Sequence, residues 1–407
     1  MQVRSACGSE LELADGRRLI DAISSWWVTL HGHAEPAIAA AVARQAQVLE
    51  QVIFANFSHA PAEQLATRLS ALSGLERLFF SDNGSTAVEV ALKIAWQWWQ
   101  NQGSQRHQLI AFEGAYHGDT FGAMALGERS LFSEPFEPLL FDVARVGWPH
   151  THWHDEQVEQ REQAALRQLE QALQTPTAAV ILEPLLQGAS GMRMVRPAFL
   201  RGVAERARAA GALLIADEVM TGFGRTGDLF ASRRAGIQPD LMALSKGLTG
   251  GFLPMGVTLA SERLYQGFIS NRPQATFFHG HSFTANPLGC AAALASLDLL
   301  QANPERYQQF VTRHTPLLEA LAQHRLVCRP RCLGTVAAFE VDAGETGYLN
   351  PVGKQIQRHC LQQGVYLRPL GSVVYLLPPL CISDRQMEHC YSVIRQALDH
   401  LDQPTMP

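Results

Sequence analysis

The chain has 407 residues, and its 38 acidic residues outnumber its 33 basic ones to give a net charge of −5. This balance argues against the phosphate attraction on which nucleic-acid binding depends, so small molecules are the expected partners. The seven cysteines contain no CxxC pair, which predicts reduced thiols in a cytoplasmic protein. The N-terminus lacks a basic-then-apolar leader, and no apolar run is long enough to span a membrane.

Five short apolar runs in the middle of the chain each stop at a polar residue. They are residues 78–80, 109–112, 180–182, 213–216 and 241–244. None alternates cleanly between apolar and polar residues, which indicates strands buried on both faces. Helical spacing between the runs predicts a wound parallel sheet with flanking helices, an α/β fold.

The polar residues that follow these strands are expected to meet at one edge of the sheet. In open α/β sheets the carboxyl ends of the strands form the ligand-binding edge. The residues expected there are Ser85, Tyr116, Glu183, Asp217 and Lys246.

The pattern changes beyond residue 302 and predicts a second, smaller domain. A helix is expected around 307–323, followed by strand-like pieces at 335–341 and 373–377. The strand-like segment 11–20 is expected to join this smaller domain from the other end of the chain. We therefore expect a large domain over 22–302 and a discontinuous α+β domain from 1–21 and 303–407.

A lysine and an aspartate at the ends of neighbouring strands predict a cofactor site. Lys246 follows the strand at 241–244 after one residue, Ser245, and a lysine at a buried strand end must be paired or lose its charge. Taken alone, it could equally reach the surface. Asp217 ends the preceding strand, and pyridoxal phosphate needs both a lysine for its aldehyde and a carboxylate for its ring nitrogen. The pair favours that cofactor over a structural role for each residue.

The turn Ser81-Asp82-Asn83-Gly84-Ser85 is the candidate phosphate site. It opens a helix, where free backbone N–H groups attract an anion, Gly84 permits close approach, and the Ser85 hydroxyl can donate. An ordinary helix cap would explain the same letters. Tyr116, after another strand, could stack on the cofactor ring. The nucleotide-binding patterns GxxxxGKS and GxGxxG are absent from the expected places.

Alternating histidines at His150, His152 and His154 raise the question of a metal site. Such spacing can bind zinc from a strand, but Pro149 and the polar flank favour a solvated loop. We expect no metal.

Several segments together resemble the class III aminotransferases of fold type I. The matching motifs are Asp-Glu-Val at 217–219, Thr-Gly-Phe-Gly-Arg-Thr-Gly at 221–227, Ser-Lys-Gly-Leu-Thr-Gly-Gly at 245–251 and Tyr-His-Gly-Asp-Thr at 116–120. The resemblance implies a mostly parallel seven-stranded sheet in the large domain. It also implies that Lys246 is the catalytic lysine.

The resemblance assigns the cofactor-binding residues position by position. It implies that Lys246 forms a Schiff base with pyridoxal 5′-phosphate and that Asp217 pairs with the pyridine nitrogen. Gly84 and Ser85 would hold the phosphate, and Tyr116 would stack on the ring.

The resemblance also implies a homodimer with shared active sites, because Ser282 matches a hydroxyl residue that reaches the phosphate of the other subunit. The substrate-binding positions that it implies are Trp27, Tyr116, Gly280, Arg368 and Tyr375. A long aliphatic substrate with one carboxylate needs an apolar slot and a single cation at its far end, which Trp27 and Arg368 could supply.

Within the family, the Trp26-Trp27 pair, Gln187-Gly188-Ala189 and Arg368-Pro369 resemble members that act in biotin biosynthesis. This implies amino transfer from S-adenosylmethionine to 8-amino-7-oxononanoate, with lysine as an alternative donor. Other candidates are a class III enzyme using an ω-amino acid or polyamine with pyruvate or 2-oxoglutarate, and a non-catalytic cofactor-binding protein.

One stretch of the family pattern has no counterpart in this sequence. Family members carry a His-Pro-Tyr stretch ahead of the segment that starts here at Leu11, and its tyrosine touches substrate. We expect either a start assigned downstream of the true one or a chain lacking part of the small domain and substrate pocket.

Overall fold

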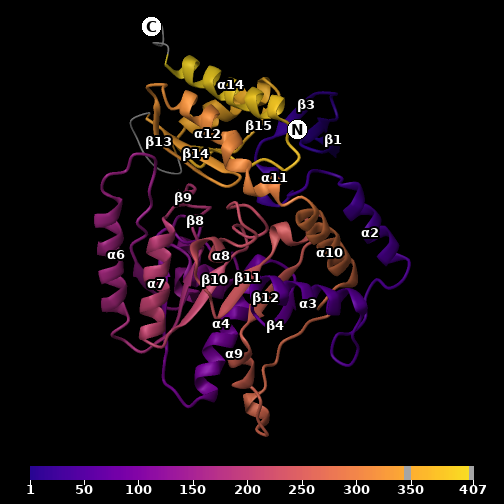
Figure 1. The fold of residues 1–407 in the computed structure, drawn as a ribbon, viewed down its shortest axis with the longest axis vertical. Helices are drawn as coiled ribbons and strands as arrows, with labels where there is room; N and C mark the ends of the chain where they lie inside the picture. The colour runs from indigo at the N-terminus through magenta and orange to yellow at the C-terminus, as the bar shows by residue number, and fades with distance from the viewer. Residues whose placement is uncertain (343–349, 403–407) are drawn as a thin grey trace.

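A computed structural model describes residues 1–342 and 350–402. Its centre is a seven-stranded sheet in the order β4-β12-β11-β10-β7-β5-β6 (Figure 1). The strands, in that order, are Arg77–Ser81, Gly256–Ala260, Leu241–Leu244, Leu213–Asp217, Thr177–Leu182, Gln108–Phe112 and Ala144–Val146. Only β12 runs in the direction opposite to the other six strands, so the prediction of a mostly parallel α/β sheet is confirmed.

The central strands are buried on both faces, as their unbroken apolar runs predicted. Every residue of β7, β10 and β11 is buried. In β5, Leu109 and Ala111 pack on one side with helix α4 (Gly84–Asn101), whereas Ile110 and Phe112 pack on the other. Alternate residues of one strand thus belong to two apolar cores, which holds the sheet between layers of helices.

Helices cover both faces of this sheet. Helix α4 lies on one face, and α6 (Val158–Ala172) and α7 (Pro197–Ala209) lie side by side on the other (Figure 1). Further helices of this part are α2 (Pro36–Ala46), α3 (Ala60–Ser73), α5 (Phe121–Leu126), α8 (Ala231–Ala235), α9 (Glu262–Gln266) and α10 (Pro287–Ala302). Short 3-10 turns are η1 (Glu134–Leu139), η2 (Lys246–Thr249) and η3 (Pro273–Ala275).

Both ends of the chain meet above the large sheet, where indigo and yellow segments lie together in Figure 1. One sheet there joins β1 (Val3–Cys7), β2 (Glu10–Leu13), β3 (Arg18–Asp21) and β15 (Val365–Tyr366). Another joins β13 (Val327–Leu333), β14 (Val336–Val341) and β16 (Val373–Leu376). Helices α11 (Glu305–Gln308), α12 (Phe310–Leu321), α13 (Val352–Gln362) and α14 (Asp384–Leu401) complete this region. The pairing of β3 with β15 ties the first residues to the last hundred.

The segment 11–20 is not one strand but a hairpin. Strands β2 and β3 are separated by a turn in which the Leu13 N–H donates to the Arg17 carbonyl at 2.9 Å. Gly16 takes φ +87° in this turn, a conformation that glycine adopts at little cost. The pair Asp15-Gly16 is a turn signal that interrupts the apolar pattern.

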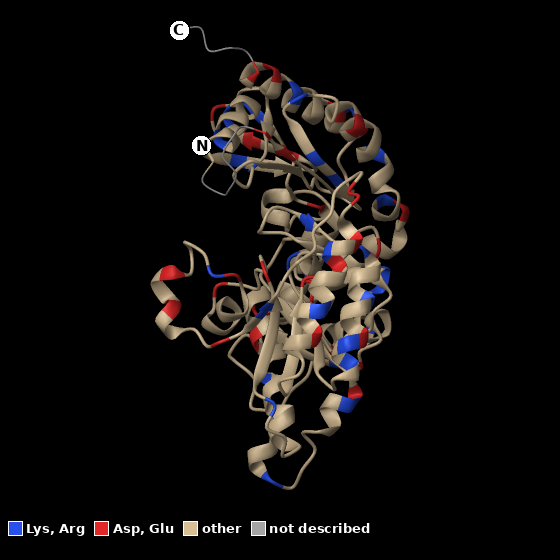
Figure 2. Ribbon diagram, turned by 90° about the vertical axis from the view of Figure 1, so that its left-hand side faces the viewer, with Lys and Arg blue, Asp and Glu red and all other residues tan. Residues whose placement is uncertain are grey.

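Charged residues are spread over the outer helices. In the side view of Figure 2, basic and acidic residues alternate along these helices, so this view shows no face of a single sign. Across residues 1–342 and 350–402, no helix has the length and apolar character needed to cross a membrane.

Candidate active site

Lys246 lies just past the carboxyl end of β11, on a strained backbone. It begins η2 with φ +41°, and the Ser245 hydroxyl before it donates to the Met255 carbonyl at 2.7 Å. The amine sits 4.8 Å from the centre of the Trp27 ring. Burial lowers the pKa of Lys246, opposed by the nearby Asp217 and Glu183 carboxylates. An amine with a lowered pKa is better able to act as a nucleophile and base.

Asp217 ends the neighbouring strand β10 and is held by a histidine. The Asp217 Oδ2 lies 2.7 Å from the Nδ1 of His117, and its Oδ1 accepts from the Val219 N–H at 3.1 Å. Both side chains are almost fully buried. The other ring nitrogen of His117, Nε2, is buried without a hydrogen-bond partner. The contact with His117 therefore fixes the Asp217 carboxylate in a buried polar corner.

Glu183 follows β7 and fixes two backbone segments of the site. Its carboxylate accepts from the N–H groups of Tyr116 and Gly188, each at 3.1 Å. Burial raises the pKa of Glu183 to about 7, with His117 opposing and Asp217 reinforcing the effect. The group can therefore gain or lose a proton near neutral pH.

The N-terminus of α4 forms a tight cradle at the same edge. Asn83 and Thr86 make a capping box, each side chain binding the other residue's N–H. An added Cβ on Gly84 would lie 2.6 Å from a Val219 methyl, so only glycine fits there. The Ser85 hydroxyl lies 2.7 Å from that of Thr120. Free N–H groups, a small residue and a hydroxyl at a helix N-terminus suit a phosphate.

These groups line one cavity of about 580 Å³, a volume typical of small-molecule sites. Tyr116 is 42% exposed on its wall, and burial of the phenol together with the nearby Asp119 raises the pKa of Tyr116. The sequence predictions brought together here are Trp27, Gly84, Ser85, Tyr116, Asp217 and Lys246.

Tyr375 and Arg368 each contact one of the two tryptophans, but Tyr375, Arg368 and Trp26 are not among the residues that line the cavity. The buried Tyr375 hydroxyl accepts from the Trp27 indole N–H at 3.0 Å, so Tyr375 stands behind Trp27 rather than on the wall. The Arg368 guanidinium stacks on the Trp26 ring at 3.9 Å from its centre. This stacking restricts the directions in which the guanidinium can point.

Gly280 and Ser282 lie on an exposed loop outside the residues that line this cavity. The Gln51 amide donates to the Ser282 carbonyl at 2.6 Å and so ties the loop to the segment before α3. The contact of Ser282 with another subunit's phosphate and the contact of Gly280 with substrate stay predictions.

Two features of the site were missed by reasoning from the sequence. One is the clamp of His117 on Asp217, whose only signal was its place after a strand end next to Tyr116. The other is Arg225, a fully buried side chain that donates to the carbonyls of Pro378 at 3.1 Å and Trp27 at 3.4 Å. Its position in the glycine-rich segment 221–227 gave no sign of these distant partners.

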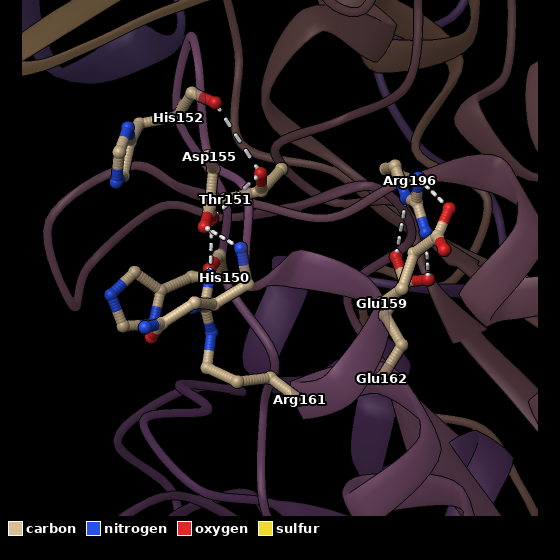
Figure 3. A network of polar contacts seen from close by, with 9 residues as sticks. His150, Thr151, His152, Asp155, Glu159, Arg161, Glu162 and Arg196 are labelled. Atoms are coloured by element: carbon tan, nitrogen blue, oxygen red, sulfur yellow. Dashed lines mark hydrogen bonds and ion pairs between the residues drawn. The ribbon is translucent and has the colours of Figure 1, made fainter.

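The histidines at 150–154 belong to a loop held by other groups (Figure 3). Asp155 accepts from the Thr151 hydroxyl at 3.0 Å and pairs with Arg161, which also donates to the His150 carbonyl at 3.0 Å. The Trp153 N–H donates to the Pro330 carbonyl. Figure 3 shows the rings of His150 and His152 set apart from each other. In the described part of the chain, no group of three or more His, Cys, Asp or Glu side chains is placed to hold a metal ion.

The cavity fits pyridoxal phosphate. An amine with a lowered pKa, a buried carboxylate held by His117 and a glycine-containing helix N-terminus all belong to residues that line one space. Lys246 would bind the aldehyde, Asp217 would hold the ring nitrogen, and Gly84 and Ser85 would hold the phosphate.

Comparisons with known proteins agree with this geometry. The family model described as aminotransferase class III matches residues 1–398. The adenosylmethionine-8-amino-7-oxononanoate aminotransferase of Synechococcus elongatus is 57% identical over 98% of this chain and 95% of its own length. The protein of the same name from Geobacter sulfurreducens is 38% identical, over 94% of this chain and 88% of its own length.

Solved structures show the same fold. A structure named as the same aminotransferase, from Methanocaldococcus jannaschii, has a TM-score of 0.91 and 30% identity, covering 99% of this chain and 94% of that one. An amine transaminase from an uncultivated Pseudomonas species, in its PLP-bound form, has a TM-score of 0.92 and 29% identity, covering 98% of this chain and 95% of that one. This chain therefore belongs to the class III aminotransferases and, like them, depends on pyridoxal phosphate.

Proposed function

We propose that this chain transfers an amino group from S-adenosylmethionine to 8-amino-7-oxononanoate and forms 7,8-diaminononanoate. The observation that carries the proposal is the wall beside the reactive lysine. The Trp27 indole lies against the Lys246 amine, and Arg368 is stacked on the adjacent Trp26. The aminotransferases named for this reaction that match nearly the whole chain support the same assignment.

Each residue that lines the cavity has a separate role in the proposed reaction. Bound pyridoxal phosphate supplies an electron sink that weakens the bonds at the donor carbon. Lys246 is the group placed to take the proton from that carbon, because burial favours its neutral amine. Asp217 would keep the cofactor's ring nitrogen protonated, and His117 fixes the orientation of the Asp217 carboxylate. Tyr116 covers one side of the space, with its backbone held by Glu183.

The substrate wall suits a long aliphatic acid. Trp27 gives an apolar surface whose position is set by the hydrogen bond to Tyr375. Arg368 is the cation for the distal carboxylate, and its planar fork can bind both carboxylate oxygens. Gly280 completes the set of substrate positions that we propose.

We also propose that the chain forms a homodimer and acts in the cytoplasm. Large exposed apolar side chains occur in the segments joined by Gln51 and Ser282, namely Val48, Ile53, Phe57, Phe278 and Phe283. Exposed apolar groups of this size are typical of a protein interface. Ser282 would then reach the phosphate site of the second subunit, with residues 22–302 as the large domain and 1–21 and 303–407 as the small one. Sedimentation that shows an active monomer would contradict the shared site.

The test is product analysis by mass spectrometry. The purified holoenzyme is given 8-amino-7-oxononanoate with S-adenosylmethionine, with lysine, or with an ω-amino acid, and in separate reactions it is given an ω-amino acid with pyruvate or 2-oxoglutarate. Formation of the diamine with S-adenosylmethionine is expected. If the diamine forms with lysine but not with S-adenosylmethionine, lysine is the amino donor. If amino groups pass only from ω-amino acids to pyruvate or 2-oxoglutarate, the chain catalyses another class III reaction.

A further inference from the structure

The turn that carries Trp26 and Trp27, labelled α1 (Ser24–Trp27), has a strained backbone. Ser24, Ser25 and Trp27 have φ of +52°, +61° and +68°. Ser25, with ψ −79°, has the angles of the rare, strained form of γ-turn. Each such non-glycine residue costs about 1–3 kcal/mol and persists only where its surroundings hold it in place.

Asp21, at the end of β3, is the group that holds the centre of this turn. Its carboxylate accepts from the Ser25 N–H at 2.6 Å, the Ser25 hydroxyl at 3.2 Å and the Ile23 N–H at 3.2 Å. The Nε2 of His33 lies 2.9 Å from the same carboxylate. Asp21 is fully buried, so these contacts are made away from water, where hydrogen bonds to a charged acceptor are strongest.

The ends of the turn are fixed by separate contacts. The Ser24 hydroxyl donates to the Leu377 carbonyl at 2.8 Å, and Arg225 donates to the Trp27 carbonyl at 3.4 Å. Between these anchored ends, the strained Ser25 directly precedes the two tryptophans. In the observed conformation Trp27 faces the Lys246 amine, whereas Trp26 is half exposed beneath Arg368.

We infer that Asp21 is a positioning residue for the substrate wall. It offsets the strain at Ser25 and thereby keeps Trp27 against the reacting lysine and Trp26 beneath the carboxylate-binding Arg368. The inference deepens the proposed function, on which its kinetic part rests. Its structural part concerns only the conformation of the turn and can be tested without cofactor or substrate.

The structural test uses fluorine NMR of the cofactor-free chain labelled with fluorotryptophan. The chain has seven tryptophans, and Trp26→Phe and Trp27→Phe variants assign the two resonances of interest. We expect Asp21→Asn to move or broaden those two and leave the other resonances in place. Asp15→Asn is the matched control, because Asp15 forms an exposed ion pair with Arg17 nearby and should move neither. Unchanged Trp26 and Trp27 resonances in Asp21→Asn, or equal shifts of all seven, would overturn the inference.

The kinetic test separates positioning from folding. For Asp21→Asn we expect the KM for 8-amino-7-oxononanoate to rise about tenfold or more, with kcat falling less than about threefold. The affinity for pyridoxal phosphate should stay within about twofold, because the turn contributes substrate-wall residues rather than phosphate contacts. A fall in cofactor affinity as large as the rise in KM would contradict a role specific to the wall.

Rescue by glycine tests the strain itself. Glycine adopts positive φ at little cost, so Asp21→Asn/Ser25→Gly should recover the KM to within about threefold of wild type. If Asp21→Asn does not fold, the double variant is expected to fold, and failure of both would assign Asp21 to folding alone. If the wild-type chain forms no diamine, the proposed function fails, and the NMR arm alone decides the inference about Asp21.

Discussion

A single added methyl group at Gly84 tests whether the α4 N-terminus is the phosphate cradle. Alanine normally stabilises a helix by about 1 kcal/mol relative to glycine. Here its Cβ would lie 2.6 Å from one methyl carbon of Val219 and 3.1 Å from the other, where ordinary contact begins at 3.4 Å. Gly84→Ala must therefore push apart the cradle and the segment after Asp217, whose Oδ1 accepts from the Val219 N–H.

The size of the effect follows from that overlap. A displacement approaching 1 Å between two groups that hold one ligand costs up to about 100-fold, so we expect the Kd for pyridoxal phosphate to rise at least about tenfold, equivalent to about 1.4 kcal/mol. The assay is titration of the cofactor-free protein, followed by absorbance, with far-ultraviolet circular dichroism to check folding. Val219→Ala removes both clashing methyl groups, so Gly84→Ala/Val219→Ala should recover cofactor affinity.

Two results would refute this reasoning. Gly84→Ala with wild-type cofactor affinity would mean that the helix N-terminus does not hold the phosphate. A double variant as weak as Gly84→Ala would mean that the contact with Val219 is not the cause. Val219→Ala alone is the control and is expected to bind the cofactor like the wild type.

Four further predictions concern other groups of the site. Lys246→Ala should abolish turnover and the absorbance of lysine-bound cofactor while the circular dichroism stays that of the wild type. Because burial raises the pKa of Glu183 from 4.5 to about 7, the folded chain binds this proton more tightly than the unfolded chain. Its stability should fall as pH rises through that window, by up to about 3 kcal/mol, and Glu183→Gln should lose this dependence in thermal melts of the cofactor-free protein. Trp27→Phe leaves the Tyr375 hydroxyl buried without its donor and should destabilise the chain by about 1–3 kcal/mol, whereas Trp27→Phe/Tyr375→Phe should regain part of the loss in denaturant titrations. Arg368→Lys should raise the KM for the keto acid with little change in kcat, because one ammonium replaces a two-pronged contact; an unchanged KM would remove Arg368 from the carboxylate site.

The edge of the sheet could be predicted because its signals are local. Strands β7, β10 and β11 each contain an unbroken apolar run, at 178–182, 213–216 and 241–244, with a polar residue directly after it. Burial on both faces is typical of parallel strands, whose carboxyl ends meet at one edge, so Asp217 and Lys246 were expected to lie near each other. The same local logic located the helix that begins at Gly84.

The strained turn and its supports could not be predicted, because they depend on contacts between distant parts of the chain. Ser24 binds a carbonyl at Leu377, and Arg225 binds one at Pro378. Neither partner leaves a periodic pattern near the turn. The prediction of one strand over 11–20 was wrong for a different reason. The apolar residues on both sides of Asp15-Gly16 suggested a continuous strand, although this pair is itself a turn signal and the chain turns there.

The most direct test of the central claim is the absorbance of the purified holoenzyme during a half-reaction with each amine alone. We predict that S-adenosylmethionine converts the lysine-bound cofactor to its aminated form, and that 8-amino-7-oxononanoate then restores the original spectrum. Lys246→Ala should show neither change. A wild-type spectrum that S-adenosylmethionine leaves unaltered, but that lysine or an ω-amino acid converts, would contradict the proposed donor and with it the proposed reaction.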